Sequence, residues 1–389
     1  MKILFLTFYF QPDLCAGSYR NTPLVEQLKT KLDDESRIDV VTTIPNRYKN
    51  FATKSKIFES DGIVNIYRID VGVHNSGMLD QSRSFIKYFL GIKKIVKDQE
   101  YDLVYASSSR LMTAFIGSLI SKKKNIPLFL DIRDIFLDTI NDVLPKIFYP
   151  IINIPIFFIE KFTFNQATKV NLISKGFVSY FKKKFPNLSY SFYPNGVDEQ
   201  FLNIDFKKQP NSKKKKIMLY AGNIGKGQGL DKIIPDLSIK LSKYWDFKII
   251  GNGGEIKKLE QKLYLKNVQN VEILQPVSRE KLIQEYIEAD CLFLHLNTYE
   301  AFKKVLPSKI FEYAATGKPI LGGLKGFSQE FINNEIDNAQ TFEPTEHIEA
   351  IKKLKKLKFK LTNRNKFIKN YNRSNQMKLM SDDIIKTIK

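Results

Sequence analysis

Short apolar runs separated by longer mixed stretches make up the first half of the chain. These runs are rich in Val, Ile and Leu and lie at 2–8, 38–43, 64–69, 103–106, 127–131, 168–173 and 189–193. A second series opens at Lys216 with IMLYAG and continues with FKIIG, NVEIL, CLFLHL and PILGG. Apolar runs that alternate with helical stretches are typical of parallel strands covered by helices on both faces. The pattern therefore predicts an α/β protein with two parallel sheets.

The two series of strands are separated by a polar, lysine-rich stretch without periodicity, which we interpret as a linker over 201–215. A chain of 389 residues is also too long for a single hydrophobic core. We therefore expect an N-terminal domain over 1–200 and a C-terminal domain over 216–370. The last segment, 371–389, is expected to form a further helix.

The strongest apolar stretch is 147–159, which reads IFYPIINIPIFFI between Lys146 and Glu160. It is too short to span a bilayer and contains two prolines. Two interpretations remain open. The stretch is either a buried helix or a patch that enters the face of a membrane beside basic residues such as Lys146 and Lys161.

The net charge of +21 is compatible with nucleic acid, an anionic membrane or anionic substrates as partners, or with a surface simply rich in lysine. Because of the apolar stretch at 147–159, we favour a membrane surface over nucleic acid.

Cys15 and Cys291 lie far apart, so no disulfide framework is implied and a reducing cytosol fits. The three histidines are isolated and no cysteine cluster occurs, so no metal is expected; they are His74, His295 and His347.

Residues 306–320, LPSKIFEYAATGKPI, carry helix start and stop signals together with groups that suit a nucleotide. Pro307 closes the preceding loop, Ser308 is a good N-cap, and glycine followed by proline ends the helix. Free N–H groups at the helix start, with Lys309, would hold a phosphate. Glu312, one turn later, could accept both hydroxyls of a ribose. The alternative is an ordinary amphipathic surface helix.

Ligands of open parallel sheets bind beyond the carboxyl ends of the strands, so the turns after the predicted strands are the candidate site. Glycines in two of these turns would let the backbone approach a diphosphate, with a lysine supplying charge. The residues are Gly222, Asn223, Gly225 and Lys226 in the first turn, and Gly251 and Gly253 in the second. After NVEIL, the backbone of Pro276 and Val277 could contact the edge of a base.

The N-terminal half offers its own candidates after its first and fifth apolar runs. Gly17 and Ser18 begin a predicted helix with Arg20 in its first turn, where a substrate phosphate could bind. The alternative is a capped turn with a surface arginine. Arg133 and Asp134 follow the strand that ends at Asp131, a common position for functional residues.

These residues resemble family 4 of the retaining glycosyltransferases over essentially the whole chain. The matching motifs are PNGVD at 194–198 with Phe201, SKG at 174–176, the glycine loop at 222–229, the turn at 251–254, and EYAATGKP from Glu312. The resemblance implies the GT-B fold, with two Rossmann-like domains whose parallel sheets face each other across a cleft, and a C-terminal helix that returns to the first domain.

Within that family, three first-domain features resemble bacterial surface-polysaccharide enzymes such as N-acetyl-fucosaminyl transferases. They are the loop at 17–20, the serines at 107–109 and DIRD at 131–134. The resemblance implies transfer of a sugar from a nucleotide diphosphate, with UDP favoured, to a lipid-linked or growing glycan acceptor at the inner face of the cell membrane. It implies no cofactor and no metal.

The resemblance also implies a role for each candidate. Lys226 and Lys309 would stabilise the leaving diphosphate, Glu312 would bind the ribose, and Asp134 would contact the acceptor or the donor sugar. Arg20, Ser18 and Arg133 would meet the acceptor, while the remaining glycines, Asn223, Pro276, Val277, Pro307 and Ser308 would line the donor site. The chain departs from the family pattern where Lys304 replaces the first glutamate of its Glu-x7-Glu motif. Asn223 and Gln228 stand in place of the usual Arg and Lys, and Arg133 in place of a histidine.

Two other classes remain as alternatives. A GT-B sugar-nucleotide epimerase would share the fold and the donor site, and would form product without an acceptor. A basic polyanion-binding protein would explain the charge but not the four phosphate-type loops at strand ends.

Overall fold

A computed structural model describes residues 1–13, 15–45, 55–72, 78–108, 111–143, 147, 149–207 and 215–388. His74, Ser109, Lys146 and residues 208–214 of the expected linker lie outside the described residues. The chain divides into two compact units, and each is described by itself. The first comprises Met1–Asn195 and Ser374–Lys389, and the second Gly196–Arg373.

The first unit is built on an eight-stranded sheet in the order β3-β4-β2-β1-β5-β6-β7-β8. All its neighbours pair in parallel except β3 and β4, which are antiparallel. The strands are β1 (Lys2–Thr7), β2 (Arg37–Thr43), β3 (Phe58–Asp61), β4 (Val64–Ile69), β5 (Leu103–Ser108), β6 (Leu128–Ile132), β7 (Lys169–Leu172) and β8 (Ser189–Ser191).

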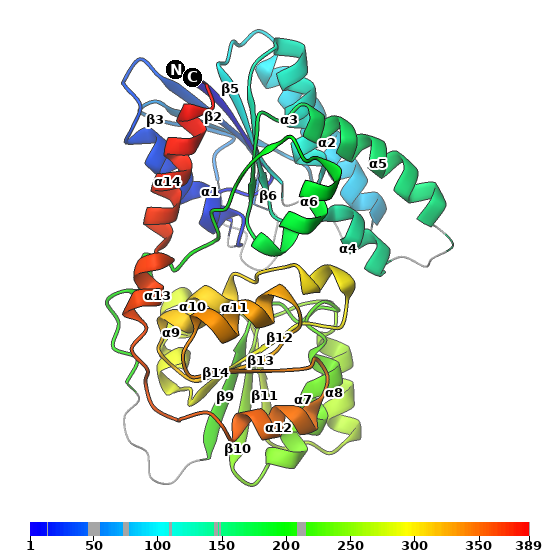
Figure 1. Cartoon of the computed structure of the whole chain (residues 1–389), viewed down its shortest axis with the longest axis vertical. Coiled ribbons are helices and arrows are strands. Elements are labelled where there is room, and N and C mark those ends of the chain that lie inside the picture. Colours follow the sequence, from blue (N-terminus) through cyan, green and yellow to red (C-terminus); the bar gives the residue numbers. More distant parts are fainter. Residues whose placement is uncertain are drawn as a thin grey trace. The chain divides into compact units, whose positions relative to one another are not determined.

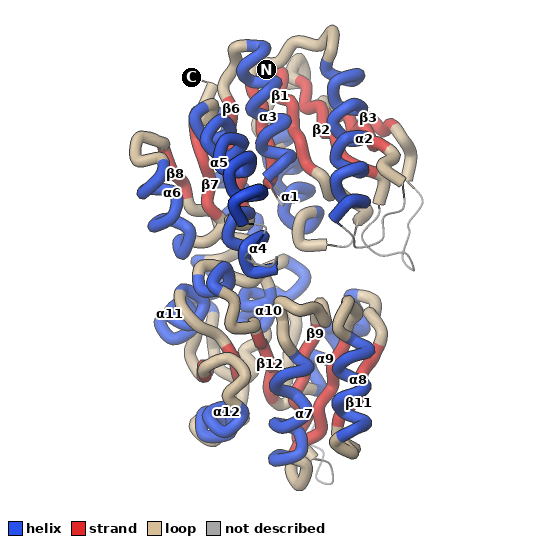
Figure 2. Tube along the Cα trace, turned by 90° about the vertical axis from the view of Figure 1, so that its right-hand side faces the viewer, coloured by secondary structure: helices blue, strands red, loops and turns tan. Residues whose placement is uncertain are grey.

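Helices cover both faces of this sheet (Figure 1). On one face lie α1 (Ser18–Lys29) and the C-terminal helix α14 (Arg373–Lys386), whose Met377, Met380 and Ile384 enter the same core as Leu24 and Leu28 of α1. The other helices of the unit are α2 (Met78–Val96), α3 (Leu111–Lys124), α4 (Phe136–Val143), α5 (Tyr149–Asn165), the 3-10 turn Lys175–Phe177 and α6 (Val178–Lys184). In Figure 2, α2, α3 and α5 lie together on the opposite face.

The second unit is a six-stranded parallel sheet in the order β11-β10-β9-β12-β13-β14. Its strands are β9 (Lys216–Ala221), β10 (Trp245–Ile250), β11 (Val271–Leu274), β12 (Cys291–His295), β13 (Ile320–Gly323) and β14 (Ala339–Phe342). Its helices are α7 (Leu230–Leu241), α8 (Ile256–Leu265), α9 (Arg279–Glu288), α10 (Lys309–Ala315), α11 (Phe327–Glu335), α12 (His347–Leu354) and α13 (Asn365–Asn370), with 3-10 turns at Glu199–Phe201 and Glu300–Lys303.

Two apolar clusters sandwich this second sheet. Side chains of α7, α8 and α12 pack on one face with residues such as Ile233 and Leu259. Side chains of α9, α10, α11 and α13 pack on the other face around Tyr286, Phe311 and Phe331. The sheet is therefore buried on both sides, as the continuous apolar strands predicted.

The predicted strands all appear, and the structure adds two that the pattern missed. Strand β3 reads FESD, an exposed edge segment without an apolar run, and β14 is a short strand, AQTF. Residues 201–207 belong to the second unit and not to a free linker, because Phe201 and Phe206 are buried in its core. The helix expected within 306–320 is limited to Lys309–Ala315, and Gly317 follows it with φ +68°.

Candidate functional site

The loops after β9 and β10 meet backbone to backbone, which explains their glycines. The N–H of Gly222 donates to the carbonyl of Ile250 at 2.9 Å. A Cβ on Gly251 would lie 1.8 Å from the carbonyl oxygen of Gly222, and one on Gly253 would lie 2.4 Å from that of Ile224. No side chain fits at either position, so glycine is required there for the two loops to form one continuous edge.

The loop after β12 joins the same edge through Asn297. Its backbone N–H donates to the carbonyl of Gly227, and its Nδ2 donates to the carbonyl of Lys226, both at 2.8 Å. Gly229 adopts φ +59° and packs directly against the Asn297 side chain. Asn297 thus fixes the shape of the glycine loop, and Lys226 on this loop has an exposed side chain.

Asn223 and Gln228, which stand where the resembled family has Arg and Lys, bind one another. Nδ2 of Asn223 donates to Oε1 of Gln228 at 2.8 Å, and the N–H of Gly225 donates to the same oxygen at 3.3 Å. The two amides therefore brace the glycine loop and add no charge to it. Positive charge at this loop comes from Lys226.

The start of α10 lies against the glycine loop, as expected, although its cap differs from the prediction. The Cε atom of Lys309 would be 3.7 Å from a Cβ on Gly222. Ser308 has helical dihedral angles, φ −58° and ψ −28°, and its side chain makes no capping hydrogen bond. The Ser308 side-chain cap was therefore wrong, because the backbone is already helical at this residue. Pro307 precedes it and accepts a hydrogen bond from the N–H of Ile310 at 3.1 Å.

Glu312 is a buried carboxylate with three partners. Its Oε2 accepts hydrogen bonds from the Tyr286 hydroxyl at 3.2 Å and from Nζ of Lys309 at 3.1 Å. Its Oε1 accepts from Nη1 of Arg279 at 3.4 Å. Burial alone would raise the pKa of the Glu312 carboxyl, but the positive charges of Lys309 and Arg279 lower it to about 2. Glu312 is therefore ionised at neutral pH and oriented from two sides.

Arg279, the first residue of α9, is a functional candidate that the sequence reasoning missed. Besides Glu312, it contacts Asp198, with Nη2 at 3.0 Å from Oδ2, and its guanidinium lies 4.9 Å from the centre of the Phe201 ring. The same Asp198 oxygen accepts from Nη1 of Arg373 at 2.7 Å. An ion-pair chain therefore leads from Glu312 through Arg279 to the Asp198 of PNGVD. A charged residue directly after Ser278, a residue type that often caps helices, was the available signal.

The loop proposed to contact a base lies beside the glycine turns. The N–H of Gly251 donates to the carbonyl of Leu274 at 2.9 Å, directly before this loop. Pro276 and Val277 are half-buried, and Val277 packs against the core on the α9 side. The second unit thus brings all four predicted loop sets to one edge of its sheet.

His295 has a structural role at this edge. It is fully buried, and its Nδ1 lies 2.6 Å from the carbonyl oxygen of Gln228, while Nε2 accepts from the N–H of Thr345 at 3.1 Å. Burial lowers its pKa to about 4, so the ring is neutral. It ties the glycine loop to the loop after β14.

In the first unit, the predicted residues Gly17 and Arg133 come together. Nη1 of Arg133 would be 2.9 Å from a Cβ on Gly17, at the start of α1, so the guanidinium reaches the first turn of that helix. Ser18 is buried there, while Asp134 is exposed. Arg133, Gly17 and Ser18 therefore form one group.

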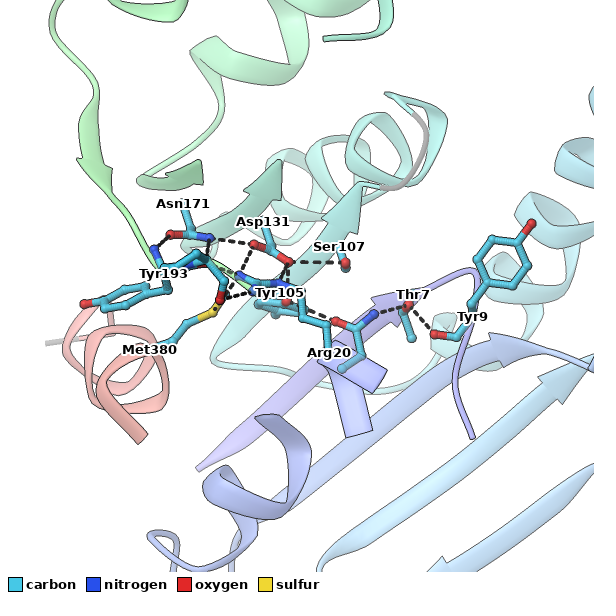
Figure 3. A network of polar contacts seen from close by, with 11 residues as sticks. Thr7, Tyr9, Arg20, Tyr105, Ser107, Asp131, Asn171, Tyr193 and Met380 are labelled. Carbon is cyan, nitrogen blue, oxygen red and sulfur yellow. Dashed lines mark hydrogen bonds and ion pairs between the residues drawn. The ribbon is translucent and has the colours of Figure 1, made fainter. Parts of the chain in front are cut away.

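Arg20 is the clear correction to the sequence analysis (Figure 3). Its guanidinium is 1% exposed and binds Asp131 with both ends, Nε to Oδ2 at 2.7 Å and Nη2 to Oδ1 at 2.8 Å. It also donates to the carbonyls of Tyr193 and Pro194. Burial alone would raise the pKa of the Asp131 carboxyl, but the charge of Arg20 lowers it. Arg20 joins α1 to the sheet and is not placed to receive an acceptor phosphate.

Metal ligands do not gather anywhere in the described parts of the chain: no group of three or more His, Cys, Asp or Glu side chains is placed to hold an ion. The expectation that no metal is needed stays a prediction.

A comparison with protein-family models matches residues 203–374 to the family described as "Glycosyl transferases group 1". Among curated proteins, WcaI of Escherichia coli strain K12, a glycosyl transferase provisionally assigned to colanic acid biosynthesis, is 33% identical over 103 residues. The matched segment covers 26% of this chain and about a quarter (25%) of WcaI.

Solved structures are similar over nearly the whole chain. WaaG, a glycosyltransferase involved in lipopolysaccharide biosynthesis, has a TM-score of 0.64 at 13% identity, covering 98% of this chain and 95% of WaaG. HepE of Anabaena, solved in complex with UDP, has a TM-score of 0.59 at 16% identity, covering 100% of this chain and 97% of HepE. At these identities the likeness concerns the fold.

Proposed function

From the glycosyl transferases group 1 domain that the chain carries over residues 203–374, we propose that the protein transfers a sugar from a nucleotide diphosphate donor to a surface glycan. The GT-B fold expected from the sequence is confirmed by the structural neighbours, and the glycosyltransferase class by the matched domain. The finer assignments that follow, from the donor to the acceptor, are part of the proposal.

The observation that carries the proposal is the convergence of Lys309, Glu312 and the glycine loops on one sheet edge of the second unit. Cleavage of the anomeric C–O bond sends its electron pair to the diphosphate, so the site must stabilise negative charge there. Lys226, on the glycine loop, and Lys309, beside Gly222, supply fixed positive charge at this place. Glu312, held as a carboxylate, is suited to accept two hydrogen bonds from the ribose hydroxyls.

UDP is the favoured nucleotide part of the donor. Two structural neighbours, HepE of Anabaena and MnaA of S. aureus, were solved with UDP. In this chain the loop of Pro276 and Val277 lies beside the glycine turns, where its backbone groups are suited to pair with the edge of a pyrimidine. The bound sugar would extend from the diphosphate away from this loop.

The acceptor is proposed to be a lipid-linked or growing glycan met by the first unit. Arg133 at the start of α1 is suited to an acceptor phosphate, since the guanidinium and a helix N-terminus attract the same charge. Asp134, exposed in the next position, is suited to a sugar hydroxyl. The named roles of WaaG in lipopolysaccharide and of WcaI in colanic acid biosynthesis support a surface glycan. We place the enzyme peripherally on the cytoplasmic face of the membrane.

Retention of the anomeric configuration follows the resembled family. The acceptor hydroxyl oxygen would attack the anomeric carbon on the face that the diphosphate leaves, and its proton would pass to the departing phosphate oxygen. This route requires no protein nucleophile and no metal. Lys304, in place of the family's first glutamate, removes a carboxylate from the neighbourhood of the donor sugar.

The test is an assay of sugar transfer from labelled UDP-sugars to a lipid extract of the source organism. We expect label in the lipid fraction with the wild type, and at least a hundredfold loss with Lys309→Ala, because charge at the leaving group is removed. Lys281→Ala, which removes an exposed lysine elsewhere in the second unit, is the control. Transfer that survives Lys309→Ala would refute the assigned diphosphate site, and a modified sugar nucleotide formed without extract would favour an epimerase.

A further inference from the structure

The first unit contains an apolar cavity that the proposed reaction does not use. Its volume is about 420 Å³, within the range of cavities that hold small ligands. It lies between α2, α3 and α4, and nine of the ten described residues that line it are apolar. They include Phe85, Phe89, Phe115, Leu119, Phe136 and Ile140. A lining of this kind offers almost no partner to a polar ligand and suits a hydrocarbon chain.

Beside this cavity, the apolar residues of α5 and the turn before it face outward. Ile147, Ile151, Ile154 and Phe158 follow one another at helical spacing and are 78%, 72%, 59% and 62% exposed. Ile151, Ile154 and Phe158 lie on one face of α5, and with Ile147 they form a patch of the kind that marks an interaction surface. No described helix is both long and apolar enough to cross a bilayer. A helix with an exposed apolar face suits a position in the interfacial plane of a membrane.

The cavity and the α5 face are neighbours. Phe115 lines the cavity from α3, and its ring centre lies 5.8 Å from that of Phe162 on α5. On the α2 side, Ile86 lines the cavity and is 59% exposed, and Leu90 one turn later is 57% exposed. Figure 2 shows α2, α3 and α5 on the same face of the unit.

Lysines gather toward the C-terminal ends of α2, α3 and α5. Each of α2, α3 and α5 connects two parallel strands of one sheet, so all three run in the same direction. These lysines are Lys93, Lys94 and Lys97 in or just after α2, Lys122 to Lys124 in α3, and Lys161 in α5, and together they are called the lysine belt. The exposed Ile151 and Ile154 precede Lys161 on α5, while the exposed Ile86 and Leu90 lie near the middle of α2. Lys122 lies 5.2 Å from the centre of the Phe162 ring, at the α3–α5 contact. An exposed apolar face on α5 with lysines nearby suits a membrane leaflet, in which anionic headgroups border the hydrocarbon.

We propose that this cavity binds one hydrocarbon chain of a bilayer lipid while the exposed face of α5 lies in the same leaflet. The lysine belt would contact anionic headgroups. This inference rests on the proposed function in one respect: lipid binding would hold the enzyme where a lipid-linked acceptor is found. Binding itself needs no sugar nucleotide and is measured without one.

The first experiment is flotation of the full chain with vesicles of phosphatidylethanolamine and phosphatidylglycerol. We expect the wild type to float with the vesicles, and Ile151→Asp to lose at least tenfold in the floated fraction. The matched control is Leu265→Asp in the second unit, where Leu265 is 71% exposed, against 72% for Ile151. Equal flotation of Ile151→Asp and wild type, or equal loss in the control, would overturn the membrane-facing role of α5.

The second experiment uses phosphatidylglycerol with a photoreactive diazirine at the end of one acyl chain, incorporated into the same vesicles. Crosslinks are expected on peptides that contain residues 82–89, 112–119 and 136–140. Leu119→Trp fills the cavity and should reduce these crosslinks severalfold while flotation persists; Met112→Trp serves if that variant does not fold. The proposal would be overturned if these peptides carried no crosslink, or if a folded cavity-filling variant were crosslinked as strongly as the wild type. Because no donor is present, failure here leaves transferase activity untouched, and loss of transferase activity leaves this result untouched.

Discussion

Nζ of Lys309 lies 3.1 Å from Oε2 of Glu312, so the two side chains proposed to hold the diphosphate and the ribose form an ion pair with each other. They are three residues apart on α10, and Arg279 meets the same carboxylate from α9. A nucleotide diphosphate would therefore enter an arrangement that is already charged and oriented. Lys309 would then contact both the phosphates and Glu312, and Glu312 would contact both the ribose and Lys309.

The first prediction concerns acid stability. The pKa of Glu312 is about 2 in the folded protein, against 4.5 for an ordinary glutamate, so its contribution to stability is complete above pH 4.5. That contribution is lost as the pH falls from 4.5 toward 2, and amounts to about 3 kcal/mol at most. Glu312→Gln should lower the free energy of unfolding at pH 7 and converge with the wild type near pH 2. Urea unfolding at several pH values measures this, and a difference that stays constant with pH would contradict the ion pairing.

The second prediction concerns Arg279, which joins Glu312 to Asp198. Arg279→Ala removes the hydrogen bonds of the guanidinium to Asp198, Glu312 and Gln200 and should lower the free energy of unfolding by about 2 kcal/mol. It should also weaken UDP binding, because Glu312 loses one of its orienting partners. Lys281→Ala, on the same helix but 62% exposed, is the matched control and should change stability by less than about 0.5 kcal/mol. Similar changes in stability and in UDP binding for the two variants would show that Arg279 is not part of the site.

The third prediction compares two glycines three residues apart. A Cβ on Gly251 would collide with the backbone of Gly222, whereas a Cβ on Gly254 would meet no atom within 4 Å. Gly251→Ala should therefore separate the two glycine loops and abolish nucleotide-induced stabilisation. Gly254→Ala should leave both the melting temperature and UDP binding close to those of the wild type. Thermal unfolding with and without UDP tests both variants, and a tolerated Gly251→Ala would show that the two loops need not touch.

The fourth prediction separates a structural role of Arg20 from a role in acceptor binding. Removal of one partner of a buried ion pair leaves an uncompensated charge and costs about 3 to 5 kcal/mol. Arg20→Ala and Asp131→Asn should both destabilise the fold by amounts of this order in urea unfolding. An Arg20→Ala protein of normal stability with a raised KM for the acceptor would instead restore the original interpretation of Arg20.

Periodicity and glycine positions were enough to predict the sheets and the sheet edge at which the glycine loops meet. Apolar strand segments and turn glycines are local signals, and both survive in the folded chain as buried strands and close backbone contacts such as that of Gly251 with Gly222. The edge strand β3 was missed because its FESD sequence carries no apolar run.

Side-chain partners were harder to predict because they depend on residues far apart in the chain. The role of Arg20 is set by Asp131, 111 positions away, and that of Arg279 by Asp198, 81 positions away. From the sequence alone, an arginine in the first turn of a helix looks the same whether it binds phosphate or a buried carboxylate. The interpretation of 147–159 also needed the structure, since only the exposed fractions distinguish a buried helix from one whose apolar face is open.

The most direct test of the account is thermal unfolding of the purified protein against UDP, GDP, ADP and TDP, each with and without magnesium. A ligand that binds only the folded state raises the melting temperature. We predict a rise with UDP that does not need magnesium and that is lost in Glu312→Gln and Lys309→Ala. An unchanged melting temperature with all four nucleotides, or a rise that both variants retain, would contradict the assignment of the donor site.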